Sequence, residues 1–351
     1  MDLTREQCRE MKGLAISSIV FHNYLHQPRF GFAAENEFSF DPARTQDFFH
    51  GVLQGVLPFL CETISFLGWA GVPVFVFLSG YGLAKKHETD FRPLPVKEYL
   101  FHSWKKLFLL LLPAILLLLA LHWGDWGYWG RNIFSLTMLA NLFTLYPSVH
   151  VYWYFGLTFE LYCLYILFNR RRSNPLLLYS SLAVILLQFI LVCFRCEEAI
   201  SWNLHNFLGW IPVFSLGVYA ARRDSLPLPS RPRTWGLFAI LAAGGLVLCN
   251  LSRYPWVFSH FFALALFLSL TKLVDELRLT RKVFIFFGGI SSFLFVAHPL
   301  ARTLANLLQS HLPDNLFLLV CVYFVAALAL AFLLRAINRL PWMKWAKPSQ
   351  S

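Results

Sequence analysis

The sequence predicts an all-α fold, a polytopic membrane helix bundle with about ten transmembrane helices that form a single domain over residues 1–351. Of the 351 residues, 57% are hydrophobic and only 14% are charged, whereas soluble domains carry about 25% charged residues. The apolar residues occur in blocks of about 17 to 24, long enough as helices to cross a hydrocarbon core of roughly 30 Å. A membrane β-barrel would instead show short alternating segments, and a disordered chain would be polar.

Ten blocks bounded by charged or turn residues are the expected spans, and the segments between them are the expected loops. The spans lie near residues 12–26, 70–86, 101–121, 152–169, 175–193, 204–221, 234–251, 256–272, 283–305 and 314–335. No small-residue cleavage site follows the first block, so we expect it to remain as the first span.

The distribution of basic residues predicts that both termini are cytoplasmic. Only six of the 30 Lys and Arg residues then fall in outer segments, and the other 24 fall in inner ones. This asymmetry is the one that the positive-inside rule describes. The formal net charge of +11 therefore reflects topology and contact with anionic membrane lipid, and we expect no nucleic-acid partner.

Two long outer connections each contain a semi-apolar stretch, from Phe48 to Leu67 and from Asn132 to Tyr146. We expect both stretches to be helices that lie at the outer membrane interface. The seven cysteines are odd in number and irregularly spaced. They predict neither a disulfide framework nor a paired zinc motif, and we expect no metal.

Ionisable groups at membrane depth are the candidate functional residues, because each costs at least about 2.5 kcal/mol at the bilayer centre. Three stand out, namely His22, Glu160 and His298. His22 lies ten residues after Lys12, which places it roughly 15 Å above the inner charges, and an imidazole can accept and return a proton near neutral pH. The alternative for each residue is a structural hydrogen bond without a chemical role.

Further candidates are polar, basic or aromatic residues near these groups. Small residues between Gly71 and Gly82 would allow close approach of a ligand or of another helix. Lys105 and Lys106 lie at the inner side, where they would bind phosphates or lipid headgroups. The outer Trp153 would stack on a sugar or belong to the interfacial aromatic belt.

Three segments, by their order and spacing, resemble motifs of the membrane-bound acyltransferase-3 family, bacterial multi-span enzymes that O-acylate sugars of cell-surface or exported glycans. Lys12-Gly13 with His22 is similar to the opening motif, in which a basic residue and glycine precede an essential histidine. The stretch from Gly71 to Tyr81 is similar to a Gly-Val-Asp-x-Phe-Phe-x-x-Ser-Gly-Phe/Tyr segment. The stretch from Ser291 to Pro299 is similar to a late Ser-Tyr-x-x-Tyr-x-x-His segment.

The resemblance implies an O-acyltransferase of the bacterial inner membrane. Acetyl-CoA or another acyl-CoA would be the cytoplasmic donor, and a hydroxyl of a cell-envelope or exported carbohydrate would be the acceptor. His22 would be the general base, and Glu160 would orient it or bind acceptor hydroxyls.

The remaining candidates would bind donor or acceptor. Lys12, Lys105 and Lys106 would hold the CoA phosphates. The candidates for substrate contacts and oxyanion stabilisation are Asn23, Ser79, Tyr81, Trp153 and His298.

Two other classes of function are open at the level of sequence. A transporter or flippase for a glycan or lipid-linked sugar would line a path with the same polar residues and make no bond. No paired Gly/Pro-broken spans in matching halves, as in inverted-repeat carriers, are present. A structural or sensory subunit would leave the burial of His22 and Glu160 unexplained.

Overall fold

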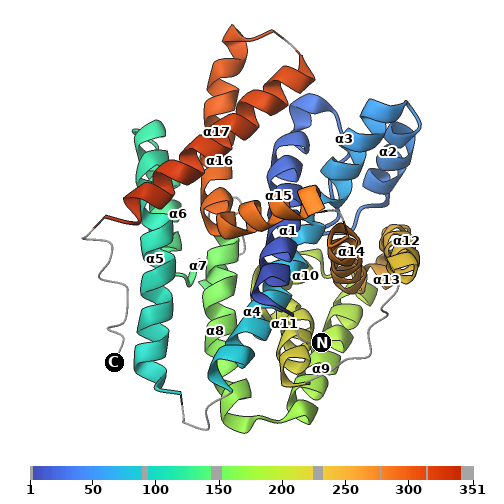
Figure 1. The fold of residues 1–351 in the computed structure, drawn as a ribbon, viewed down its shortest axis with the longest axis vertical. Helices are drawn as coiled ribbons and strands as arrows, with labels where there is room; N and C mark the ends of the chain where they lie inside the picture. Colours follow the sequence, from blue (N-terminus) through green and yellow to red (C-terminus); the bar gives the residue numbers. More distant parts are fainter. Residues whose placement is uncertain are drawn as a thin grey trace. The chain divides into compact units, whose positions relative to one another are not determined.

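The computed structural model describes residues 3–88, 94–143, 152–223, 232–276, 278–313 and 315–340. All regular elements in these residues are helices, which confirms the predicted all-α fold (Figure 1). The chain divides into two compact units. Unit 1 comprises Met1–Phe91, Arg171–Leu204 and Leu208–Ser291, and unit 2 comprises Arg92–Arg170, His205–Phe207 and Ser292–Ser351.

Unit 1 contains the N-terminal helices and most of the second half of the chain. Its elements are α1 (Arg5–Leu25), η1 (Pro28–Phe30), α2 (Pro42–Val52), α3 (Val56–Leu67), η2 (Gly68–Gly71), α4 (Val72–His87), α9 (Asn174–Cys193), α10 (Glu197–His205), α11 (Phe207–Arg222), α12 (Pro232–Cys249), α13 (Arg253–Trp256), α14 (Ser259–Val274) and α15 (Arg278–Gly289). Thr4 and Gln7 form a capping box at the start of α1, which satisfies backbone N–H groups that have no partner within the helix.

Unit 2 contains α5 (Val96–Leu121), α6 (Trp126–Ser135), α7 (Ala140–Phe143), α8 (Trp153–Arg171), α16 (Ser291–Leu308), η4 (Gln309–His311) and α17 (Leu316–Ile337). Side-chain hydrogen bonds to backbone carbonyls tie these helices together. Tyr152 donates to Val296 O over 3.0 Å, and Asn338 donates to Leu109 O over 3.3 Å. Tyr154 and Phe295 add an aromatic contact between α8 and α16, with ring centroids 5.0 Å apart.

A helix covers most of each of the ten expected spans, but fewer are long and apolar enough to cross a membrane by themselves. Among the described residues, four segments meet both conditions, or five if α15 and α16 together form one broken span. The four are Val56–His87, Val96–Leu121, Asn174–Cys193 and Leu316–Ile337. The chain is therefore a helical membrane protein, and the count of about ten spans and the side of the termini stay predictions.

Three expected helices are interrupted in the structure. The stretch from Phe48 to Leu67 is divided between α2 and α3 at Gly55. Its φ of 137° is an angle that glycine adopts readily and other residues rarely do. The stretch from Asn132 is divided between α6 and α7, where Met138 has a φ of 63°, and residues 144–146 lie outside the described residues. The span over 283–305 is not one continuous helix, because α15 ends at the Gly288-Gly289 pair, a poor helix-forming sequence.

Glycines allow the helices of unit 1 to pack backbone against backbone. A Cβ atom at Gly13 of α1 would collide with the carbonyl oxygen of Phe284 in α15, which crosses α1 (Figure 1). A Cβ at Gly80 of α4 would likewise collide with Phe214 O of α11, and one at Gly217 of α11 with Phe77 O. The small residues of α4 therefore serve helix packing.

We expect Gly80→Ala to lower the free energy of unfolding by about 1–3 kcal/mol, because the added methyl group would force α4 and α11 apart. The matched control is Gly82→Ala on the same helix, where a Cβ atom would meet no other atom within 4 Å. The control should change stability by less than about 1 kcal/mol. Thermal unfolding of the purified protein in detergent measures both, and equal midpoints for the two variants would contradict the packing.

An acidic cluster surrounds Arg281 of α15, beside the N-terminal end of α1. Arg281 Nη2 lies 2.8 Å from Glu6 Oε2, and its Nε lies 3.2 Å from Asp275 Oδ1 and 3.5 Å from Glu10 Oε2. The Glu10 side chain is fully buried. Burial, together with a hydrogen bond to Asp275 and its negative charge, raises the pKa of Glu10 to about 8 against the lowering effect of Arg281.

The raised pKa of Glu10 predicts that stability falls as the pH rises from about 5 to above 8. The folded state favours the protonated Glu10 carboxyl, whose ordinary pKa is 4.5. Its contribution to the free energy of unfolding is therefore fully present below pH 4.5 and is lost as the pH rises through about 8. Glu10→Gln keeps the neutral form at every pH. Thermal midpoints should therefore fall less for the variant than for the wild type across this range, and parallel profiles would reject the assignment.

Candidate functional site

His22 lies near the C-terminal end of α1 and is held by the backbone of α3. Its side chain is 3% exposed. Nδ1 lies 2.8 Å from Ser65 O and 3.3 Å from Ile64 O. A carbonyl oxygen only accepts hydrogen bonds, so these contacts place the ring proton on Nδ1 and the lone pair of the neutral ring on Nε2.

The position of His22 is also fixed by contact with η2. Ser18 Oγ donates a hydrogen bond to Gly68 O over 2.9 Å. A Cβ atom at Gly68 would lie only 2.5 Å from His22 Cβ. Because Gly68 has no side chain, the side chain of His22 can pack directly against its backbone.

His26 and Glu35 lie beside His22 and form with it what we call the His–Glu cluster. His26 follows one helical turn later, and the centroids of the two imidazole rings are 4.9 Å apart. One ligand atom from each of His22, His26 and Glu35 lies within 4.8 Å of the other two. His26 and Glu35 are only partly buried, so the cluster has both a buried and an accessible side.

The segment that carries Glu35 is tied to the helices around it. Ala33 N–H donates to Glu62 Oε2, and Ala33 O accepts from Ser65 Oγ, both over 2.8 Å. Arg44 donates to Glu35 O over 2.8 Å, and Trp256 donates to Asn36 O. These bonds restrain the backbone on both sides of Glu35, which orders its carboxylate against the two histidines.

The electrostatics of the cluster favour an ionised Glu35. Burial raises the pKa of its carboxyl, but His22, His26, a backbone hydrogen bond and Arg44 lower it, and the net shift is downward. Glu35 is therefore a carboxylate at neutral pH. This residue was not among the candidates drawn from the sequence, because it lies in a loop and its approach to His22 depends on contacts distant in the chain.

The other candidates in unit 1 belong to α1 and α4, and they lie at different distances from His22. Asn23 adjoins His22, and its Nδ2 donates to Ile19 O over 3.0 Å. Lys12 lies ten residues before His22, roughly 15 Å along the helix axis. Tyr81 is at the opposite end, where its hydroxyl accepts from Leu3 N–H over 2.8 Å, so roughly 25 Å of helix separate it from His22. Ser79 Oγ donates to Phe75 O in its own helix.

Unit 2 contains the remaining candidates, of which Glu160 has the most unusual surroundings. Its side chain is 5% exposed, and Oε2 accepts from Phe207 N–H over 2.8 Å. Oε1 has no hydrogen-bond partner among the described residues. A buried carboxylate oxygen without a partner is costly, and such atoms often contact a ligand.

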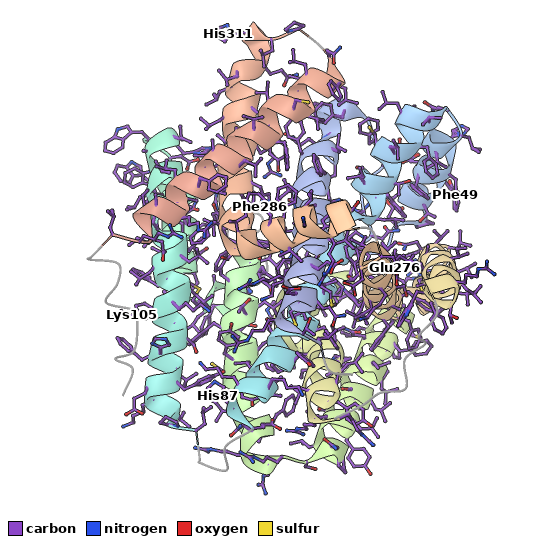
Figure 2. All side chains as sticks on the ribbon, in the orientation of Figure 1. Phe49, His87, Lys105, Glu276, Phe286 and His311 are labelled. Carbon is purple, nitrogen blue, oxygen red and sulfur yellow. The ribbon has the colours of Figure 1, made fainter. Side chains whose placement is uncertain are left out.

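Trp153, His298, Lys105 and Lys106 also lie in unit 2. Trp153 packs edge-on against His205, with centroids 5.6 Å apart. His298 is 1% exposed, and its Nδ1 lies 3.3 Å from Leu294 O. Lys105 projects from α5 (Figure 2), with Nζ 5.9 Å from the Phe101 ring centroid, and Lys106 is exposed.

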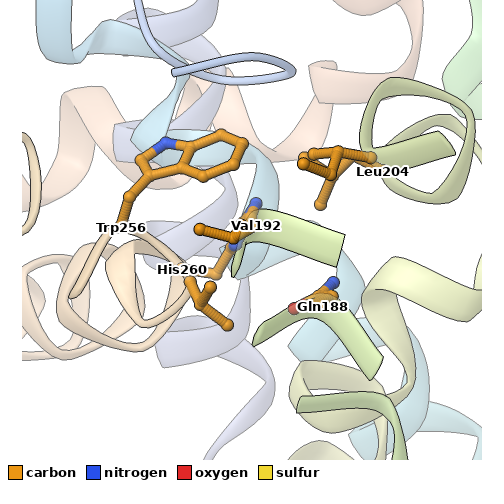
Figure 3. A pocket seen from close by; sticks show the side chains of 7 residues that line it. Gln188, Val192, Leu204, Trp256 and His260 are labelled. Atoms are coloured by element: carbon orange, nitrogen blue, oxygen red, sulfur yellow. The ribbon is translucent and has the colours of Figure 1, made fainter. Parts of the chain in front are cut away.

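A further buried histidine, His260, was not predicted as a site residue. It packs between Trp69 and Trp210, with centroid distances of 5.5 and 4.5 Å. The pocket beside it is lined by apolar side chains and Gln188 (Figure 3). About 10 Å³ of cavity volume is open to a water-sized molecule, which admits one water at most and excludes a sugar or CoA.

Comparison with known protein families agrees with the helical membrane fold. A family model described as an acyltransferase domain matches residues 11–336, nearly the whole chain. The chain belongs to the acyltransferase-3 family. It is accordingly a membrane acyltransferase, and this match confirms the resemblance read from the three motifs. No curated protein and no solved structure matches the chain.

We expect Gly68→Ala to lower the rate of acyl transfer by this acyltransferase without unfolding it. The new methyl group would displace His22, and a misplacement of 1 Å at a reacting group costs about 10²-fold in rate. Gly289→Ala is the control, because a Cβ atom there would meet no other atom within 4 Å. A normal turnover number for Gly68→Ala would show that the place of His22 is unimportant for the reaction.

Proposed function

We propose that this acyltransferase moves an acyl group, most simply acetyl, from cytoplasmic acyl-CoA to a hydroxyl of a cell-envelope or exported carbohydrate. Membership of the acyltransferase-3 family supports the reaction class, and the apolar helices support a site in the membrane, here the bacterial inner membrane. The observation that carries the proposal is the His–Glu cluster, in which His22 Nδ1 is bonded to Ser65 O and a carboxylate lies close by.

His22 is the general base of the proposed reaction. Its Nε2 takes the proton of the acceptor hydroxyl as the hydroxyl oxygen attacks the thioester carbonyl carbon. The tetrahedral intermediate then collapses, the carbon–sulfur bond breaks, and the imidazolium returns the proton to the CoA thiolate. The products are the O-acyl sugar and CoA, so no other reactant is required.

Glu35 stabilises the imidazolium that forms during this step. Its carboxylate lies within 4.8 Å of ligand atoms of both histidines, and a negative charge at that distance favours the protonated ring. Ser65 O holds the opposite nitrogen in the donor state. These two neighbours meet the two requirements of a histidine base, a defined tautomer and charge stabilisation.

Glu160 binds acceptor hydroxyls in this proposal. Its buried Oε1 has no partner in the described part of the chain, and a sugar hydroxyl would donate the hydrogen bond that the oxygen lacks. Trp153 would stack on the sugar face, and His298 would contribute a further polar contact.

The donor would be held mainly by cations. Lys12, Lys105 and Lys106 would bind the phosphates of acyl-CoA. Of the oxyanion candidates, Asn23 fits best, because it adjoins His22 and its side-chain amide is a hydrogen-bond donor. Ser79 already donates to Phe75 O, and Tyr81 lies at the far end of α1.

Acyl transfer from radiolabelled acetyl-CoA to candidate glycans tests the proposal. We expect His22→Ala to reduce transfer by roughly 10²–10⁴-fold, the usual contribution of a general base. His50→Ala, which alters an exposed histidine of α2, is the matched control and should retain full activity.

Two outcomes would overturn the proposal. Glycan uptake into vesicles without label transfer would favour a flippase or transporter. Transfer that is undiminished in His22→Ala would reject this residue as the base and leave the family assignment intact.

A further inference from the structure

The His–Glu cluster contains one residue, His26, to which the proposed acyl transfer gives no role, and the three residues together offer a set of metal donors. Two imidazoles lie at helical positions i and i+4, with the backbone bond from His26 N–H to His22 O measuring 3.0 Å. This spacing puts both rings on one face of α1. Glu35 adds a carboxylate from the loop, and the three ligand atoms lie within 4.8 Å of one another.

We propose that His22, His26 and Glu35 form a binding site for a divalent transition-metal ion, with Zn²⁺ as the best-matched ion. Two histidines and one glutamate, with a fourth position left for water, are a donor set that zinc accepts. Magnesium and calcium prefer sites made of oxygen atoms alone. A soft ion such as Cu(I) prefers thiolate or thioether sulfur, which this cluster lacks.

The distances need only a small adjustment to accommodate the ion. Three donors on a triangle with sides of at most 4.8 Å lie at most about 2.8 Å from its centre. Zinc bonds to nitrogen and oxygen measure about 2.0–2.2 Å, so each donor would move inward by at most about 0.7 Å. Side-chain rotation supplies such a movement without displacing α1.

The surroundings of the three residues favour a metal in two ways. The hydrogen bond from His22 Nδ1 to Ser65 O (2.8 Å) is the outer contact that fixes the tautomer of a metal-binding histidine and directs Nε2 to the ion. The backbone of Glu35 is held by Arg44, which donates a hydrogen bond to Glu35 O over 2.8 Å. His22 and Glu35 are thus held in position by hydrogen bonds to neighbouring residues.

Zinc binding to the tag-free, full-length protein in detergent, measured by competition with a chromophoric chelator, tests the site. We expect one Zn²⁺ per chain, bound through nitrogen and oxygen donors in the X-ray absorption spectrum. His26→Ala and Glu35→Gln should each weaken binding by more than about 100-fold, the upper end of the cost of losing an outer contact. His50→Ala should bind as the wild type does.

Three results would overturn the site. These are the absence of zinc binding by the folded wild type, sulfur donors in the absorption spectrum, and unchanged affinity in both Glu35→Gln and His26→Ala. His26→Gln replaces His26→Ala if the alanine variant does not fold, as judged by circular dichroism and thermal unfolding.

Bound zinc would inhibit the acyltransferase, a consequence that rests on the proposed function. A metal-bound Nε2 has no lone pair for a proton, so the inhibition constant of Zn²⁺ should equal its dissociation constant. Zinc binding without inhibition would reject His22 as the base and leave the metal site in place. If His22→Ala loses transfer and the wild type binds no zinc, His22 is retained as the base and the metal site is rejected.

Discussion

Close backbone contact along α1 is the constraint on which the rest of unit 1 depends. Gly13 admits the carbonyl of Phe284, and Gly71 admits the carbonyl of Ala15, so α1 has little room to rotate or slide against α15 and η2. Hydrophobic burial contributes little to helix association within lipid, so such contacts largely determine packing there. His22 lies on this helix with Gly68 against its Cβ. The precision of the candidate site is therefore a property of helix packing.

The sequence predicted the helices well and their interruptions poorly. Apolar blocks define membrane helices because the bilayer imposes both composition and length, so long helices such as α5, α9 and α17 were expected close to where they occur. The breaks at Gly55 and Met138 depend on single positive φ angles. Glycine adopts such angles readily, but hydropathy does not report the backbone angle of a residue such as Met138. The break between α15 and α16 follows the Gly288-Gly289 pair, and hydropathy does not report this local preference either.

The sequence indicated the two histidines of the candidate site but not its carboxylate. His22 stood out because an imidazole at membrane depth needs a reason, and His26 was recognisable only by its spacing of four residues. Glu35 gave no signal of its own, because its position depends on Ala33 meeting Glu62 and on Asn36 meeting Trp256, a contact between residues 220 positions apart. The pattern of two histidines four residues apart, followed by acidic residues in the next loop, is the feature that would have suggested the cluster.

The loop that carries Glu35 contains a second acidic residue, Glu37, and the carboxyl pKa values of the two residues shift in opposite directions. Burial and the charge of Glu35 raise the pKa of Glu37 well above its usual range, whereas the pKa of Glu35 is lowered. A single negative charge beside two imidazoles is balanced by one proton or overbalanced by one divalent ion. Proton transfer and metal binding at His22 are therefore mutually exclusive, because both require the same nitrogen lone pair.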